Sequence, residues 1–429
     1  MSEEKDKEEF SFMKEKIKAK PINKKKLLLK VAGTVVLAVL FGVVASFTFV
    51  ITSPIAEKKY GEKEEIPSVT IPRDDEAAQN PEPEATPTPV PAPSNPPAVI
   101  QQTVGIEVED YRKLYNKLYE VAAGLDKALV TVTAVSSNVD WFNVPYTNQG
   151  KGSGVIVAEN GIEYMILTDE RVLEGAEQIM VTFANDTQVE ATVKKIDHNT
   201  EIAILSVRMD TLEEDTRNAV EVAVLGNSFQ VRKGTPVIAI GSPLGYPDSM
   251  SIGMVTSAGN HIATWDANYT MFTTDILGNA DGSGVLINLD GDVIGVITQE
   301  SNDNSSENVV TAYSVSELKS VIEHLSNGLD LAYMGIKGTP VTDEKAEENG
   351  MPQGIYIVET ALDSPAMNVG IQNGDILVKL GTEEVKDMKD VQNVLLNLSP
   401  NQLVTAVVMR PGKDGYKELT YQVTLGVRE

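Results

Sequence analysis

The sequence predicts a mainly β protein in which a pair of all-β barrels is followed by a smaller α+β domain. Its 429 residues are enough for two or three domains. Between about residues 130 and 326, short β-branched runs such as VIVA, MILT, IAILSV and VIGVIT alternate with turns rich in Gly, Asn and Asp. This pattern is typical of antiparallel barrels and disfavours an α/β fold. A second domain is predicted to begin near Ala332.

Composition excludes several classes of function. The net charge of -26 would repel a phosphate backbone, and no basic stripe interleaved with aromatic residues is present, so no nucleic acid is expected as a partner. Cysteine is absent, which excludes disulfides, thiolate metal sites and cysteine nucleophiles. The acidic run NLDGD, residues 288–292, lacks the full ligand pattern of a calcium loop. We therefore expect neither a metal ion nor a cofactor.

The N-terminal part of the chain predicts a membrane anchor. Residues 31–51 carry no charge, and a helix of this length reaches about 30 Å, the thickness of a hydrocarbon core. Lysines crowd its N-terminal side, which places residues 1–30 in the cytoplasm and the main body outside, as a single-pass protein of the cell membrane. A cleaved signal peptide is the alternative, but the segment that follows does not resemble a small-residue cleavage site.

A linker rich in proline and glutamate is expected over residues 52–100, and it includes the run NPEPEATPTPVPAPSNPP. Proline fixes φ and has no backbone donor, so this stretch is predicted to be an extended spacer that holds the folded part away from the membrane. A Pro-x-x-Pro ligand is the functional alternative.

Two helices are predicted next to the barrel strands. Apolar residues recur at three- and four-residue spacing between Val108 and Leu125, which indicates an amphipathic helix leading into the first strand. Another helix is expected before Gly328, where Ser314 and Glu317 have the spacing of a capping box.

Five segments of the barrel region carry motifs that resemble those of the trypsin-like domain of HtrA/DegP-type serine proteases, and we expect such a domain over residues 101–328. In that family the catalytic residues lie in a TNNHVV-like turn, a D-x-x-T-D-hydrophobic turn and a G-N-S-G-G loop. The resemblance places Arg171 at the histidine, Glu201 at the aspartate and Ser283 at the nucleophilic serine. The segments are GKGSGVIVAENG (150–161), LTDERVLEGA (167–176), DHNTEIAILSV (197–207), VIAIGSPLG (237–245) and TTDILGNADGSGVLINLDGDVIGVI (273–297).

The replacement of histidine by Arg171 removes the general base that such a site needs. A serine hydroxyl is a poor nucleophile unless an adjacent base accepts its proton. The guanidinium stays protonated, with a pKa above ~12, so Arg171 can donate hydrogen bonds but cannot accept the proton of Ser283. Loss of the base in a triad costs on the order of 10⁶ in turnover in another serine protease. We further expect Arg171 to form a two-pronged hydrogen bond with Glu201, with two unrelated surface charges as the alternative.

The serine loop differs from the family pattern as well. DGSGV replaces GNSGGP, and the segment from TTD to LDG is one residue shorter. The backbone N–H groups of Asp281 and Ser283 are candidates for an oxyanion hole, although the family has glycine at the first of these positions. Alternatively, Ser283 is only a turn residue.

A relocated base would restore catalysis, so each of the three histidines is a candidate to be checked. His198 is the best placed, three residues before Glu201. His261 is expected in a loop, and His324 on the helix that ends the barrel region.

The residues after about 329 resemble the PDZ domain that follows the protease in HtrA-type proteins. The similar segments are YMGIKG (333–338), GIYIVETALDSPAMNVGIQNGDILVKLGTEEV (354–385) and VTLGV (423–427), and the domain is expected over residues 329–429. Such domains bind a peptide C-terminus as an added strand and hold its carboxylate on backbone amides. The resemblance assigns that loop to Tyr333, Met334, Gly335 and Ile336. Met334 and Ile336 also fit a core role, and the two roles are compatible.

Two functions follow from these observations. The first is a membrane-anchored HtrA-like pseudoprotease that binds unfolded segments or protein C-termini outside the cell, in quality control or as a scaffold or sensor. The second is an active serine endopeptidase that uses Ser283 with a non-standard base. We favour the first, because a fold does not carry a function without its site. The resemblance also implies a homotrimer.

Overall fold

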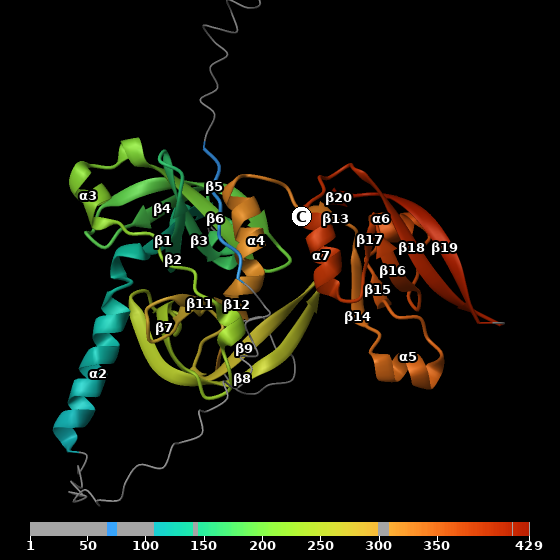
Figure 1. Ribbon diagram of the computed structural model, residues 1–429. Helices are drawn as coiled ribbons and strands as arrows, with labels where there is room; N and C mark the ends of the chain where they lie inside the picture. Colours follow the sequence, from blue (N-terminus) through green and yellow to red (C-terminus); the bar gives the residue numbers. More distant parts are fainter. Residues whose placement is uncertain (1–66, 75–106, 140–144, 299–308, 414, 429) are drawn as a thin grey trace, which may run out of the picture. The chain divides into compact units, whose positions relative to one another are not determined.

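The computed structural model describes residues 67–74, 107–139, 145–298, 309–413 and 415–428 (Figure 1). The predicted cytoplasmic tail and membrane helix, residues 1–30 and 31–51, lie outside this part of the chain. Within the described ranges, no helix is both long and apolar enough to cross a membrane.

Six antiparallel strands close the first barrel in the order β1-β2-β3-β6-β5-β4. Its core is made of Val, Ile, Leu and aromatic side chains, and every residue of β6 except the last is buried. The β-branched residues Val and Ile and the aromatic residues among them pack well on a pleated strand. The strands are β1 (Leu129–Val139), β2 (Pro145–Glu159), β3 (Glu163–Asp169), β4 (Gln178–Thr182), β5 (Gln188–Asp197) and β6 (Ile202–Arg208).

The second barrel repeats this design in the order β10-β11-β12-β9-β8-β7. The prediction of a barrel pair is confirmed. Strands β8 and β9 form a long hairpin, in which Thr264 and Ala267 are the last paired residues before the turn. The strands are β7 (Pro236–Ser242), β8 (Ser249–Thr264), β9 (Ala267–Leu277), β10 (Ser283–Ile287), β11 (Val293–Thr298) and β12 (Val309–Ser314).

The C-terminal domain has its own core beneath a sheet ordered β14-β15-β16-β18-β19. A separate two-stranded sheet pairs β13 with β20, and β17 pairs with β16. Helices α5 (Asp343–Asn349), α6 (Pro365–Val369) and α7 (Met388–Leu396) complete the domain. Its strands are β13 (Ala332–Tyr333), β14 (Ile336–Pro340), β15 (Ile355–Thr360), β16 (Ile376–Leu380), β17 (Glu383–Glu384), β18 (Leu403–Gly412), β19 (Gly415–Thr424) and β20 (Gly426–Val427).

Helices accompany the barrels at three places: α2 (Val108–Ala123), α3 (Glu214–Ala219) and α4 (Val315–Ser326). The predicted helix over 108–125 is therefore present as α2. The part of it that packs on the core is the C-terminal end, with Ala122 buried, whereas the remaining apolar side chains of its stripe are mostly exposed.

The capping box predicted at the start of α4 is wrong. The Ser314 hydroxyl makes no side-chain cap, because its Oγ lies 2.7 Å from the Oγ of Ser228. The Glu317 carboxylate accepts hydrogen bonds from the N–H and Oγ1 of Thr270 on β9, at 2.6 and 2.9 Å. Both side chains therefore bind residues that are distant in the sequence, Ser228 and Thr270, in place of the backbone N–H groups at the start of α4.

Residues 67–74, inside the predicted linker, lie along α4. Val69 and Ile71 are buried. The backbone N–H of Ile71 donates to the Glu323 side chain on α4 at 2.8 Å, and the N–H of Val69 donates to the Asn327 side chain, just after the end of α4, at 2.7 Å. Asp74 accepts hydrogen bonds from Ser316 and from Lys319, whose Nζ lies at 2.7 Å. This stretch belongs to the folded body and is not part of a spacer.

The pair of Asp74 and Lys319 allows a direct test of this docking, since the Lys319 side chain is only 3% exposed. We expect Asp74→Ala to lower the free energy of unfolding by about 3 kcal/mol, because it leaves a buried ammonium unpaired. Adding Lys319→Met should recover most of the loss. Denaturant unfolding of the full chain measures both.

The exposed pair of Arg208 and Asp210 provides the control. Asp210→Ala is expected to change stability by less than about 0.5 kcal/mol. Equal effects of Asp74→Ala and Asp210→Ala would mean that residues 67–74 are not docked.

Candidate functional site

Arg171 lies in a 3₁₀ turn, η3 (Glu170–Leu173), directly after β3. Asp169 caps this turn, since its carboxylate accepts a hydrogen bond from the backbone N–H of Arg171 at 2.8 Å. The same carboxylate binds the guanidinium: Arg171 Nε lies 2.9 Å from Oδ1, and Nη2 contacts Oδ2. A planar guanidinium and a carboxylate match each other in this two-pronged way. Asp169 thus fixes the direction of Arg171.

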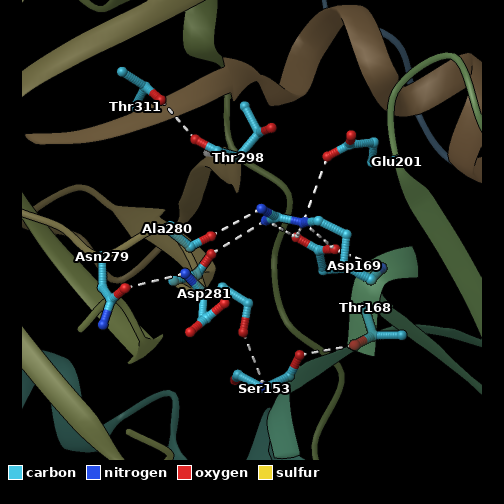
Figure 2. Close-up of polar contacts among 12 residues, drawn as sticks. Ser153, Thr168, Asp169, Glu201, Asn279, Ala280, Asp281, Thr298 and Thr311 are labelled. Carbon is cyan, nitrogen blue, oxygen red and sulfur yellow. Dashed lines mark hydrogen bonds and ion pairs between the residues drawn. The ribbon is translucent and has the colours of Figure 1, made fainter. Parts of the chain in front are cut away.

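Glu201 lies on another side of the guanidinium, with its Oε2 3.5 Å from Arg171 Nε (Figure 2). Its backbone has φ +55°, a left-handed conformation that is uncommon for a residue with a Cβ. Its C=O accepts a hydrogen bond from the N–H of Glu170 at 2.9 Å, which ties the β5–β6 loop to η3. The structure brings Arg171 and Glu201 together, but the expected two-pronged bond is made with Asp169.

The charge of Arg171 is strongly maintained. The hydrogen bond that the guanidinium donates to Asp169 raises the pKa of Arg171 above its ordinary value, against the opposing effect of burial. The negative charges of Asp169, Glu201 and Asp281 act in the same direction as that bond. Arg171 is therefore a permanent cation and donor at this site.

The serine loop is attached to Arg171 through its carbonyl groups. Arg171 Nη1 donates to the C=O of Ala280 at 2.9 Å and Nη2 to that of Gly282 at 3.5 Å (Figure 2). The N–H of Asp281, predicted as an oxyanion-hole donor, points to the Oδ1 of Asn279 at 3.2 Å. In this arrangement the loop turns the carbonyl oxygens of Ala280 and Gly282 toward the Arg171 guanidinium.

Ser283 is the first residue of β10 and is 2% exposed. Its Oγ accepts a hydrogen bond from the backbone N–H of Ser153 on β2 at 3.2 Å. Gly152 on β2 lies close to both η3 and β10, since a Cβ there would be 2.3 Å from Val172 Cγ2 and 3.3 Å from Ser283 Oγ. The hydroxyl is thus held between the barrels and has almost no surface for a substrate.

A pocket of about 350 Å³ opens beside Arg171, and His198 is one of its lining residues. His198 Nδ1 contacts the Glu170 carboxylate, and Glu201 lines the same pocket. Ser283 is not among the described residues that line it. His261 Nδ1 lies 3.4 Å from Thr270 Oγ1, and both ring nitrogens of His324 lie 2.9 Å from backbone carbonyls.

No cluster of three or more His, Asp or Glu side chains that could hold a metal ion occurs in the described ranges.

The four residues predicted to bind a peptide carboxylate lie together at the start of the C-terminal domain. The N–H groups of Met334, Gly335 and Ile336 all donate to one carboxylate, that of Asp266. Met334 and Ile336 are fully buried, so the core role holds as well. Burial raises the pKa of Tyr333 to about 12. Sequence reasoning missed Asp266, which comes from the β8–β9 turn and carries no local signal for this role.

Comparison with known proteins agrees with the two-domain architecture. Residues 152–296 match the family model of the trypsin-like peptidase domain, and residues 332–425 match that of the PDZ domain. The chain is 28% identical over 281 residues to the serine protease Do-like HtrA of Lactobacillus helveticus, covering 62% of this chain and 66% of that protein. It is 31% identical over 268 residues to a probable periplasmic serine endoprotease DegP-like of Halomonas elongata, covering 61% and 54%.

A solved structure, the HtrA-type protease AlgW with decapeptide, has a TM-score of 0.52 and 22% identity, covering 72% of this chain and 99% of that one. This likeness shows the fold. The double barrel with a C-terminal PDZ domain defines the class as a trypsin-like peptidase fold joined to a PDZ domain. The chain is similar to HtrA/DegP-type proteins, and it spans about two thirds or less of the length of the relatives named above.

Replacement of Arg171 tests how much the site depends on its guanidinium. Arg171→Met is expected to lower the free energy of unfolding by about 2 kcal/mol, because it strands Asp169, which is 8% exposed, and frees the carbonyls of the serine loop. Thermal unfolding of the full chain measures the change.

Arg208 is a matched control, since it forms a two-pronged pair with Asp210 at the same spacing on an exposed surface. Arg208→Met should alter stability by less than about 0.5 kcal/mol. If the two variants unfold alike, Arg171 does not organise the site.

Proposed function

We propose that this protein is an HtrA-like pseudoprotease that binds unfolded segments or C-terminal peptides, in quality control or as a scaffold or sensor. One observation carries the proposal: a permanently charged guanidinium occupies the place where catalysis needs a base. Arg171 is held there by Asp169 and by the carbonyls of Ala280 and Gly282.

The surroundings of Ser283 support the same proposal. Attack by a serine hydroxyl needs a base within hydrogen-bond reach and donors for the developing oxyanion. Among the described residues, the partner of Ser283 Oγ is a backbone N–H, which can donate but cannot accept a proton. The amide of Asp281, one of the two predicted oxyanion donors, is directed to Asn279. In this arrangement Ser283 has no base among its described contacts, and one of its predicted donors is already engaged.

An active endopeptidase that uses Ser283 is the second candidate. The observation in its favour is that His198 lines the same pocket as Arg171 and Glu201. Rearrangement of the serine loop toward His198 would be needed, since Ser283, on β10, is buried against β2.

Peptide binding is assigned to the C-terminal domain. Residues 333–336, called the carboxylate loop from here on, have three convergent backbone N–H groups. This is the arrangement used to capture a C-terminal carboxylate. The AlgW structures, described as containing a decapeptide or a tripeptide, support this assignment by similarity.

The proposal includes a location and an assembly. Residues 31–51 anchor the chain in the cell membrane with its N-terminus in the cytoplasm, on the strength of their length, their lack of charge and the lysines before them. Trimer formation, by analogy with the family, would give the exposed apolar stripe of α2 a surface to pack against.

Proteolysis is the direct test of the proposal. We expect the full chain to leave a casein-like unfolded substrate intact and to resist a serine-reactive phosphonate, as the Ser283→Ala variant does. An active HtrA protease serves as the positive control. Cleavage and labelling that disappear in Ser283→Ala would establish the endopeptidase instead, and His198→Ala would then identify the base.

Alkaline pH offers a second test. Because the hydrogen bond to Asp169 raises the pKa of Arg171 above its ordinary, strongly basic value, the charged form and its stabilising contacts persist throughout the neutral and moderately alkaline pH range. Raising the pH from 7 to 10 should therefore produce no cleavage. Activity that appears with a midpoint in this range would show that another group acts as a base.

A further inference from the structure

The carboxylate loop of the C-terminal domain already holds a carboxylate. Asp266 Oδ2 accepts from the N–H of Met334 at 2.7 Å and from that of Gly335 at 3.0 Å, while Oδ1 accepts from Gly335 and Ile336, both at 2.9 Å. Gly335 has φ +84°, and a Cβ there would lie 2.4 Å from Ser364 Cβ, so only glycine lets these amides converge.

The backbone around Asp266 continues this arrangement. The N–H of Asp266 donates to the C=O of Ile336 at 2.8 Å, and Asn268 Nδ2 donates to the C=O of Gly338 at 3.3 Å. The β8–β9 turn therefore lies against β14, the strand to which a bound peptide would add. Figure 1 shows this hairpin, in yellow-green, extending to β14 and α7.

The hairpin also fills the space toward α7. Ala267 and Tyr269 are fully buried, and the Tyr269 hydroxyl accepts a hydrogen bond from Gln392 Nε2 on α7 at 2.9 Å. Beside the turn, Lys337 Nζ lies 4.3 Å from the centre of the Trp265 ring. A carboxylate, a strand-like backbone and buried side chains thus occupy the groove between β14 and α7.

The loop favours the ionised form of its occupant. Burial raises the pKa of the Asp266 carboxyl, while the N–H groups of Gly335, Ile336 and Met334 oppose that shift by stabilising the carboxylate. The hydrogen-bond partners of its two oxygens among the described residues are all N–H donors, and a charged acceptor suits such a set.

We infer that Asp266 is an internal ligand of the C-terminal domain, and that a peptide ending in a free carboxylate binds only by displacing the β8–β9 turn. The inference rests on the proposed function, because it concerns the same peptide site. If the turn must leave first, the apparent affinity of the chain for the peptide depends on the fraction of molecules in which the turn has left the groove. Peptide binding and release of the hairpin become one event.

A binding experiment on the full chain in mild detergent tests this competition. The probe is a fluorescein-labelled pool of decapeptides that end in Ala, Val, Leu or Phe with a free carboxylate, and the amidated pool is its negative control. Asp266→Asn keeps the side-chain shape and removes the charge. We expect it to bind the free-carboxylate pool at least tenfold more tightly than the unmodified chain.

Asn268→Ala is the matched control, because it removes a hairpin contact to β14 and leaves the carboxylate in place. Its affinity should change less than about threefold, the scale of one neutral hydrogen bond. Equal affinities of the unmodified chain and Asp266→Asn would overturn the inference and leave the peptide-binding function standing.

Hydrogen exchange provides a readout that needs no variant. In the unmodified chain, a saturating amount of the pool should speed the exchange of the Asp266 amide, while the amides of Met334, Gly335 and Ile336 stay protected by the new ligand. Unchanged exchange at Asp266 with the pool bound would also overturn the inference. If the pool binds neither protein, the proposed peptide-binding function fails, and Asp266 is then only a joint between domains.

Discussion

A buried ion pair between Arg428 and Asp197 is the contact between the described domains whose loss would cost most. Arg428 Nη2, at the end of the C-terminal domain, lies 2.8 Å from the Oδ2 of Asp197 at the end of β5, and their side chains are 6% and 0% exposed. Burying two charges costs several kcal/mol per ion, so the arrangement is stable only while both remain paired. Asp197 also accepts a hydrogen bond from Thr200, next to Glu201. The Asp197 carboxylate therefore binds two partners at once. Through Thr200 it stabilises the loop beside Arg171, and through Arg428 it holds the C-terminal domain against the first barrel.

The chemistry of the region around Arg171 follows from a permanent cation placed among acceptors. A histidine could accept and return a proton, whereas Arg171 only donates. Its guanidinium lies beside the Asp169 carboxylate, Glu201 and the two carbonyls of the serine loop. The charge stabilises each of these groups, and loss of the arginine would leave them without that partner. Arg171 is therefore a structural centre that joins η3, the β5–β6 loop and the serine loop.

Features that depend on repeated or local patterns could be predicted from the sequence, and contacts between distant residues could not. Alternating β-branched runs predicted the barrels, and the resemblance to the trypsin-like domain implied the proximity of Arg171 and Glu201. Asp169 could have been found, since an Asp two residues before an Arg both caps a turn and reaches the guanidinium. Glu317 was misassigned, because Thr270 on β9 outcompetes a local cap. Asp266 was beyond reach, because its partners are nearly 70 residues away and meet it only through the domain arrangement.

The docking of residues 67–74 on α4 limits the reach of the proposed membrane anchor. If residues 31–51 form that anchor, about 15 residues separate it from Pro67, and such a length spans at most ~50 Å even when fully extended. The folded part of a tethered protein would then begin within that distance of the lipid surface, which restricts the targets that it can meet to polypeptides near the membrane.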